Sequence, residues 1–579
     1  MQKTGGKFVT ALTGLVILTL IGPLGCRRGQ SPSPELQSLL AADTLDRQVG
    51  DATVRAAVRA FYTETGTTLA WSRDTPTKRT DEALAVLAFA RAHGLDPNTY
   101  QLAALTAERD LLARPPKAER RRALAVFDVR LTAALIRLGR DVAVGRTEPM
   151  AVDRRWKAQR STPNLAATLA ASRDDMSEWL RAIQPQHAEY AALVRGLAAL
   201  QGADAKGSWR AVPSVVVKPG ASHSGIAVLR MRLAASGDLG AASVDGNRYD
   251  QPLEHAVRVF QEHHGLSATG RLDPKTLAAL NVPLGTRLRQ VALNLERWRW
   301  LPDDLGARHF RVNIPSFHLE AYEQGKIVFD IRAVVGKPGN ETPIFSERMT
   351  HVVMSPYWNI PPKIAADETM PAAWADPDYL DRQNIEVVRV SDNRTTVVDT
   401  STLDWSDDQA LAGLRFRQRP GAGNALGFVK FMFPNEYDVY VHDTPAEALF
   451  SRLGRAFSHG CVRVEEPLEL AKYVLRDQSR WTPEAIVGAM HAGTETHVKL
   501  REAIPIHILY FTSWVDPKGG LQFRDDVYGY DAKQAALATK ATITTTRRHD
   551  GTKTNLKEER SRPEANAKAP EAIAPASGG

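Results

Sequence analysis

The sequence predicts a multidomain α+β protein with an N-terminal helical region, a small three-helix unit and a β-rich domain that carries a capping insertion. Its 579 residues exceed a single hydrophobic core, so several domains are expected. Apolar residues recur at helical spacing over residues 49–210 and again over 216–282. Over residues 306–515 the chain instead carries short runs rich in Val, Ile, Phe and Tyr, separated by turn residues.

The composition is that of an ordinary globular protein. Apolar residues make up 43% and charged residues 24%, and the net charge of +8 is a modest excess for this length. The arginine run Arg120–Arg122 is interpreted as a solvated helix face, because no nucleic-acid-binding motif accompanies it. We therefore expect no nucleic-acid partner.

The N-terminus has the pattern of an export signal. Lys3 and Lys7 precede an apolar run of 17 residues, Phe8–Leu24. This run is short for a membrane-spanning helix and fits the core of a signal peptide. We expect residues 1–26 to be this signal, with an uncleaved membrane anchor as the alternative.

The run closes on Gly25-Cys26, which resembles a bacterial lipoprotein processing site. The resemblance implies that Cys26 carries lipid and holds the protein on a membrane in the periplasm. Residues 27–48, which include a Ser/Pro-rich stretch, are then expected to form a tether. Which membrane would hold the protein stays open.

Residues 49–210 are expected to form a helical scaffold with no catalytic spacing. A helix near residue 90 should end in a C-terminal cap at His93-Gly94. Asp128 and Asp141 are interpreted as surface or capping-network residues rather than an acid/base pair. The clearest apolar stripe consists of Leu124, Phe127, Leu131, Leu135, Leu138 and Val142.

Residues 216–282 are expected to bury one small core between three short helices. The third helix has its start signal at Asp273-Pro274, an N-cap residue followed by Pro at the first helical position. His263 and His264 are adjacent and face different sides of the second helix, so we interpret them as surface and core edge. No metal site is expected.

The β-rich domain should continue into two helices, at 445–453 and 467–475, and a final strand pair at 495–499 and 505–512. The expected earlier strands are His309–Ile314, Leu319–Gln324, Lys326–Val335, His351–Tyr357, Phe428–Phe433 and Tyr437–His442.

Two further segments interrupt or follow this domain. Residues 365–418 are acidic and less regular, and we expect this insertion to cover the site as a lid. Residues 532–579 contain no aromatic residue and are rich in Ala, Thr, Lys, Glu and Pro, so a disordered tail is expected.

The chemistry centres on one of the two cysteines of the chain, Cys461. If Cys26 carries lipid in an exported protein, Cys461 has no disulfide partner and remains a free thiol. A thiol titrates near pH 8.5 and needs a neighbouring histidine to form a thiolate and an imidazolium. His459 is close in sequence, but His442 at the end of an expected strand is preferred as the base.

The residues around the thiol suggest how a substrate would be held. Strand alternation places Tyr440 on the same face as His442. Gly460 would let a reacting carbonyl approach the backbone, whose N–H groups would form an oxyanion hole. Arg463, two residues past the thiol, either binds a substrate carboxylate or holds the loop.

The order His442, fifteen residues, then Ser458-His459-Gly460-Cys461-Val462-Arg463 resembles the signature of YkuD-type L,D-transpeptidases. The unit at 216–282 resembles the peptidoglycan-binding domain type 1. Further motifs resemble the large subgroup of these enzymes, which has a scaffold domain and a capping insertion: Phe61-Tyr62, His93–Asp96, Ser355–Pro361, Asn424–Gly427 and Phe433–Asn435. One departure is Asn340-Glu341, where a basic residue is expected.

The resemblance implies a reaction and roles for these residues. Cys461 would attack the third residue of a peptidoglycan tetrapeptide stem, with His442 accepting its proton, and D-alanine would leave. An amine on a second stem would then form a 3–3 cross-link. His459 would support the loop, and Gly460 and Cys461 would supply N–H donors. The expected substrate contacts are Arg463, Tyr440, Trp358 and Ser458.

No metal or organic cofactor is needed for this chemistry, and carbapenems are expected inhibitors because they acylate such thiols. The implied partners are the stem peptides and glycan of peptidoglycan, and the membrane. Three alternatives stay open: an L,D-carboxypeptidase, an enzyme that attaches a lipoprotein to peptidoglycan, and a non-catalytic wall-binding protein.

Overall fold

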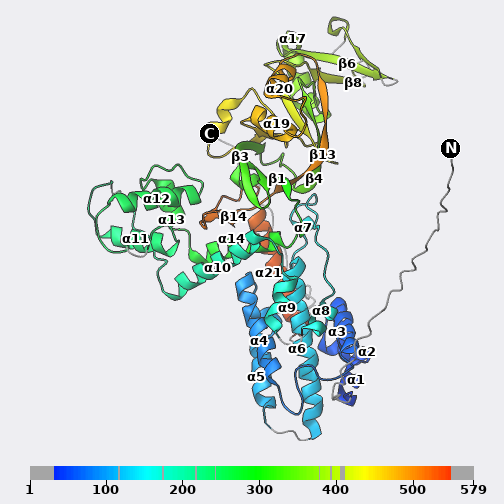
Figure 1. Cartoon of the computed structure of the whole chain (residues 1–579), viewed down its shortest axis with the longest axis vertical. Coiled ribbons are helices and arrows are strands. Elements are labelled where there is room, and N and C mark those ends of the chain that lie inside the picture. Colours follow the sequence, from blue (N-terminus) through cyan, green and yellow to red (C-terminus); the bar gives the residue numbers. More distant parts are fainter. Residues whose placement is uncertain are drawn as a thin grey trace, which may run out of the picture. The chain divides into compact units, whose positions relative to one another are not determined.

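The protein is described by a computed structural model, which divides into two compact units (Figure 1). The first unit comprises the chain up to Arg91 with residues 100–143 and 162–184, and the second comprises the remainder. No helix among the described residues is long and apolar enough to cross a membrane. The expected signal peptide and Cys26 lie outside the described residues, which are 32–114, 118–172, 175–214, 218–240, 243–376, 378–391, 394–403, 411 and 413–549.

The first unit is helical, as predicted, and the apolar stripe on its longest helix is buried. The tether expectation is wrong from Pro34 onwards, because Leu36, Leu39 and Leu45 are buried on two short helices. The helices are α1 (Pro34–Leu40), α2 (Ala42–Gln48), α3 (Ala52–Glu64), α4 (Lys78–Phe89), α5 (Leu102–Leu112), α6 (Ala118–Val144), α8 (Leu165–Ala171) and α9 (Met176–Ile183).

Asp128 on α6 is fully buried, so of the two expected roles, surface residue and capping-network residue, the structure supports the second. Its carboxylate accepts hydrogen bonds from the backbone N–H groups of residues 70–72, at 2.8 to 3.1 Å. It also accepts from the hydroxyl of Tyr62 at 2.7 Å. Asp128 therefore fixes the turn that follows α3, since the N–H groups of the buried residues Trp71 and Ser72 would otherwise have no partner.

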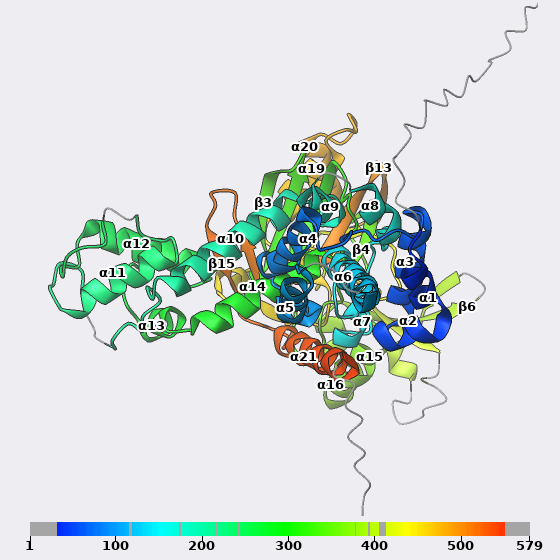
Figure 2. The same ribbon diagram turned by 90° about the horizontal axis from the view of Figure 1, so that it is seen from below.

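The predicted three-helix unit is confirmed as α11 (Gly225–Ala235), α12 (Gln251–His263) and α13 (Pro274–Leu280), which group together in Figure 2. Asp273 caps α13 by accepting from Thr276 N–H, as its sequence predicts. His264 stacks on Phe260 in the buried part of this unit. His263 is half-buried, with Nδ1 2.6 Å from Asp238 Oδ1.

Two longer helices flank this unit in the sequence, α10 (Ala188–Ala205) and α14 (Leu284–Trp298).

Gly94 has a φ of +72°, as expected for the predicted cap. A Cβ at this position would lie only 2.7 Å from the Cβ of Ala292 on α14. The glycine is therefore required by close packing as well as by backbone conformation.

The β-rich domain is built on a nine-stranded sheet in the order β11-β3-β12-β10-β9-β4-β13-β1-β2. β2, at one end of this order, also pairs with β3 near the other end, so the sheet closes on itself. The strands are β1 (Arg308–Asn313), β2 (His318–Glu323), β3 (Lys326–Gly336), β4 (Phe345–Met354), β9 (Val429–Met432), β10 (Val441–His442), β11 (Ala456–Ser458), β12 (Val462–Val464) and β13 (Thr496–Leu509).

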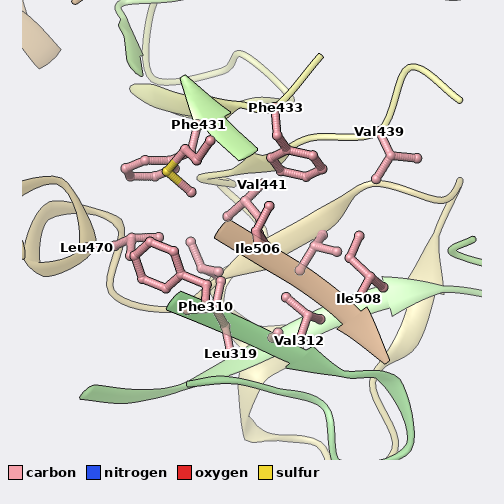
Figure 3. Close-up of a cluster of buried hydrophobic side chains, with 14 of the residues drawn as sticks. Phe310, Val312, Leu319, Phe431, Phe433, Val439, Val441, Leu470, Ile506 and Ile508 are labelled. Atoms are coloured by element: carbon pink, nitrogen blue, oxygen red, sulfur yellow. The ribbon is translucent and has the colours of Figure 1, made fainter. Parts of the chain in front are cut away.

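Apolar side chains from these strands fill the interior (Figure 3). Phe310 and Val312 on β1, Val441 on β10 and Ile506 on β13 belong to this core. Leu470 adds to it from helix α19 (Pro467–Leu475), and helix α20 (Pro483–Met490) also packs against it. The hydrophobic interior fixes the register of each strand, because a one-residue slip would turn its apolar residues outward.

Three sequence predictions in this domain are wrong in detail. The expected strand pair near 495–512 is one strand, β13, with an irregularity between Lys499 and Ile504. The expected helix at 445–453 is a 3₁₀ segment, Glu447–Ser451. The strand expected from Tyr437 begins only at Val441, because Asp438 has a φ of +53° within a tight turn.

The insertion is more regular than predicted. Together with β5, which precedes it in the chain, it forms a second sheet in the order β5-β8-β6-β7, with a small core around Val387 and Phe416. A helical stretch that includes the π-helix Ala365–Thr369 lies between β5 and β6 in the sequence. The strands are β5 (Trp358–Asn359), β6 (Ile385–Ser391), β7 (Arg394–Val397) and β8 (Leu414–Gln418).

The first part of the expected disordered tail is helical, since α21 spans Tyr530–His549. Gln534 is buried, and Asp531 forms an ion pair with Arg297 at 2.6 Å. Before α21, the hairpin of β14 (Ser513–Val515) and β15 (Leu521–Phe523) completes the described fold. Residues 550–579 of the expected tail lie outside the described residues.

Candidate active site

The pairing of β10 with β12 places the candidate residues on one face of the closed sheet. The two strands are parallel, and Val441 lies beside Val462 while His442 lies beside Arg463. Both valines are buried in the hydrophobic core. Because side chains alternate along a strand, His442 and Arg463 face the opposite side from this core.

Tyr440 links the two strands at the thiol. Its carbonyl oxygen accepts from the N–H of Val462 at 3.1 Å, which brings Tyr440 next to Cys461. The backbone N–H and the hydroxyl of Tyr440 both form hydrogen bonds with the sulfur. The indole of Trp358 on β5 in turn donates to the Tyr440 hydroxyl. Sequence reasoning gave Tyr440 only the role of a pocket wall and missed its direct contact with the thiol.

The thiol of Cys461 is protonated in this arrangement. Burial raises its pKa to about 11, while the hydrogen bonds from Tyr440 and the charge of Arg463 act in the opposite direction. The sulfur also lies 3.8 Å from the carbonyl oxygen of Asp438. Cys461 is a free cysteine, as predicted, but it is not a resting thiolate.

His442 is a buried, neutral imidazole. Its Nδ1 lies 2.5 Å from the carbonyl oxygen of Asp443, and because a carbonyl can only accept, Nδ1 carries the proton. Nε2 therefore holds the lone pair. Burial, together with the charges of Arg463 and Lys430, lowers the pKa of His442 to about 3, although the hydrogen bond to Asp443 acts in the opposite direction.

The expected ion pair between His442 and Cys461 is absent, since no hydrogen bond joins these two described residues. The ring of His442 instead lies 5.6 Å from that of Tyr440, between centroids. The two side chains share a face of the sheet, and the neutral imidazole of His442 keeps its lone pair on Nε2. A neutral imidazole and a neutral thiol can react by general base catalysis.

His459 is directed at the insertion. Its Nε2 lies 2.8 Å from Oε1 of Glu368, which belongs to the π-helix. Both side chains are exposed. The insertion therefore reaches the loop that carries Cys461, which agrees with the expectation that it lies over the site.

The loop before Cys461 is held by its own hydrogen bonds. The hydroxyl of Ser458 donates to the Cys461 carbonyl at 2.6 Å and accepts from the Gly460 N–H at 3.2 Å. Ser458 is buried and so serves the loop in place of the expected substrate contact. The N–H of Gly460, expected to be an oxyanion donor, is already engaged, whereas that of Cys461 has no partner among the described residues.

Arg463 forms no ion pair or hydrogen bond with another described residue, and its Nε is buried without a partner. Burial lowers the pKa of its guanidinium, and the neighbouring Cys461 is the charge that opposes this. A cation left without a carboxylate partner on this face can accept an anionic group of a substrate.

Lys430 on β9 is a further residue that sequence reasoning missed. It lies beside His442 in the register of β9 with β10, so its side chain shares the same face. Its Nζ lies 3.8 Å from Glu495. The lysine at an alternating strand position was visible in the sequence, but the strand pairing was not.

The unexpected acidic residue Glu341 has a basic neighbour from a distant segment. The guanidinium of Arg155 donates to the Glu341 carbonyl at 3.2 Å and lies 3.7 Å from its carboxylate.

No group of three or more His, Cys, Asp or Glu side chains in the described part of the chain is arranged to hold a metal ion.

Comparison with known families matches three segments of this chain. Residues 307–498 match the L,D-transpeptidase catalytic domain, which contains all of the candidate residues above. Residues 56–197 match a scaffold domain, and residues 222–280 match the family described as "Putative peptidoglycan binding domain".

A "Putative L,D-transpeptidase" of Haemophilus influenzae is 34% identical over 250 residues. This match covers 43% of the chain and 49% of the relative, so the chain spans about half the length of the curated relative.

Among solved structures, an L,D-transpeptidase from Stackebrandtia nassauensis is 14% identical, with a TM-score of 0.21, over 51% of this chain and 96% of that one. L,D-transpeptidase 3 from Mycobacterium tuberculosis, in complex with a faropenem-derived adduct, is 12% identical, with a TM-score of 0.17. That match covers 35% of this chain and 60% of the other.

The three family matches agree with the helical, three-helix and β-rich regions in their order along the chain. The candidate residues converge on one face of the third region. The chain carries a YkuD-type L,D-transpeptidase catalytic domain together with a scaffold domain and a peptidoglycan-binding domain.

Proposed function

We propose that this protein is a cysteine-dependent L,D-transpeptidase that forms 3–3 cross-links in peptidoglycan. The observation that carries the proposal is the grouping of a free thiol, a neutral imidazole and an unpaired guanidinium on one face of the sheet. The matched peptidoglycan-binding domain supports the choice of peptidoglycan as the substrate.

In the first step, a tetrapeptide stem enters with the carbonyl of its third residue at the sulfur of Cys461. Nε2 of His442 takes the thiol proton as the sulfur–carbon bond forms. Arg463 attracts a carboxylate of the stem. The bond to the terminal D-alanine then breaks, its amine receives the proton from His442, and a thioester remains on Cys461.

In the second step, the side-chain amine of diaminopimelate on another stem attacks the thioester. The amine loses its proton to His442, the carbon–sulfur bond breaks, and the sulfur takes this proton from His442, which restores the thiol of Cys461. The product is a cross-link between the third residues of two stems. Water in place of the amine would give a tripeptide, which is the product of an L,D-carboxypeptidase.

We also propose that the protein works in the periplasm, held at a membrane through lipid on Cys26. The support is the apolar run that ends at this cysteine. Labelling of cells with a radioactive fatty acid should mark the wild-type protein and spare Cys26→Ser. Equal labelling of the two would contradict lipid attachment at this residue.

The enzyme activity is tested by incubating the purified protein with a disaccharide tetrapeptide and analysing the products by mass spectrometry. We expect free D-alanine and a 3–3 linked dimer, and neither product from Cys461→Ala. Tripeptide without dimer would replace the transpeptidase with a carboxypeptidase. If D-alanine is not released and a carbapenem forms no adduct, the protein is a wall-binding protein and not an enzyme.

A further inference from the structure

Thr342 lies directly behind the loop that carries Cys461. It is fully buried on the turn between β3 and β4. Its hydroxyl donates to the carbonyl oxygen of Gly460 at 2.8 Å and accepts from the N–H of Gly336 at 2.8 Å. The Thr342 hydroxyl therefore acts as a donor to the loop and as an acceptor within the turn.

The bond to Thr342 determines where the next N–H points. In a trans peptide, the carbonyl of Gly460 and the N–H of Cys461 lie in one plane and point in opposite directions. Because the carbonyl is held towards Thr342, the N–H of Cys461 is directed away from it. This N–H has no partner among the described residues, and the N–H of Gly460 is occupied by Ser458.

The turn that presents Thr342 is itself tightly packed. A Cβ on Gly336 would lie 2.1 Å from the carbonyl oxygen of Asn340, so only glycine fits at this position. The hydroxyl of Tyr528 donates to the Gly336 carbonyl at 2.7 Å and accepts from the Thr342 N–H at 3.2 Å. The position of the Thr342 hydroxyl is therefore fixed from two sides.

We propose that Thr342 is a positioning residue that orients the N–H of Cys461 as the oxyanion donor of the site. This inference rests on the proposed acyl transfer, because only that chemistry places negative charge on a carbonyl oxygen. A donor that is already oriented stabilises this charge without further reorganisation. Thr342 acts through the peptide bond and does not touch the substrate.

The test compares two reactions of the same sulfur in Thr342→Val and Thr342→Ser. Acylation by a carbapenem passes through an oxyanion, whereas alkylation by iodoacetamide displaces iodide and forms none. Valine keeps the shape of threonine and removes the hydroxyl. Thr342→Val should therefore slow acylation by about 10²-fold, the usual effect of losing one oxyanion donor. Alkylation should stay within about twofold of wild type, and Thr342→Ser should restore acylation.

Two results would overturn the proposal: wild-type acylation in Thr342→Val, or an equal loss in both reactions, which would indicate a disordered loop. If Thr342→Val does not fold, Tyr528→Phe releases the turn and keeps Thr342. It should slow acylation and spare alkylation, and unchanged acylation would then refute the proposal. If the wild-type thiol is alkylated but never acylated, the proposed function itself fails.

Discussion

His459 Nε2 lies 2.8 Å from Glu368 Oε1, so the imidazole closest in sequence to Cys461 is bound to the insertion. His442, nineteen residues before Cys461 in the chain, carries its lone pair on the face that Cys461 shares. The two histidines of the motif therefore have different tasks. One can accept a proton, and the other joins the loop to the insertion.

This difference predicts the effect of removing each ring. His442→Ala should slow carbapenem acylation by about 10²- to 10⁴-fold, the usual contribution of a general base. His459→Ala should cost less than about tenfold, because an exposed ion pair contributes only about 0–1 kcal/mol. Glu368→Gln is the matched control and should behave like His459→Ala. A larger loss in His459→Ala than in His442→Ala would reverse the assignment of the base.

The protonation states predict how reactivity depends on pH. Burial raises the pKa of Cys461 to about 11 and lowers that of His442 to about 3, so both are neutral near pH 7. The rate of alkylation by iodoacetamide should rise about tenfold per pH unit from pH 7 to 10, since it follows the thiolate.

The control for this profile is the same protein unfolded in urea, where alkylation should level off near the ordinary thiol pKa of about 8.5. A plateau below pH 8 in the folded protein would instead show a resting thiolate paired with an imidazolium. The raised pKa also means that the folded protein holds the thiol proton more tightly than the unfolded chain does. Protonated Cys461 therefore stabilises the fold below about pH 8.5, and this stabilisation is lost as the pH rises towards 11.

The backbone conformation of Gly460 is expected to make its replacement by another residue costly. Its φ is +123°, in a region that L-residues rarely adopt, although a Cβ would meet no atom closer than 4.0 Å. Gly460→Ala should therefore strain the backbone by about 1–3 kcal/mol and slow acylation. Gly454→Ala is the matched control on the same loop, since it has open space and no positive φ. Equal acylation rates in the two variants would show that the φ of Gly460 does not matter.

The scaffold offers a prediction about stability. Asp128→Ala would leave the N–H groups of residues 70–72, of which Trp71 and Ser72 are buried, without an acceptor, so the unit should lose about 2–5 kcal/mol. The measurement is urea unfolding followed by tryptophan fluorescence, because Trp71 is buried at this turn. Asp110→Ala, at an exposed ion pair with Arg109, should change stability by less than about 1 kcal/mol. Equal effects of both substitutions would rule out this role for Asp128.

The sequence predicted elements well where their signals are local. The apolar stripe of α6 and the cap at Gly94 were found because helical spacing and glycine conformation act over a few residues. The short strand β10 was predicted too long, because the turn at Asp438 gives no strong sequence signal. The helix α21 was missed because its stability comes from tertiary contacts such as that of Asp531 with Arg297.

The sequence alone determined which residues we propose for the chemistry: a thiol at Cys461 and two histidines at characteristic spacing, followed by Arg463. Only the tertiary structure decided their states. Burial keeps the thiol and His442 neutral, and the pairing of β10 with β12 brings Tyr440 to the sulfur. These properties depend on desolvation and on contacts between distant strands, and neither is encoded in the spacing of residues along the chain.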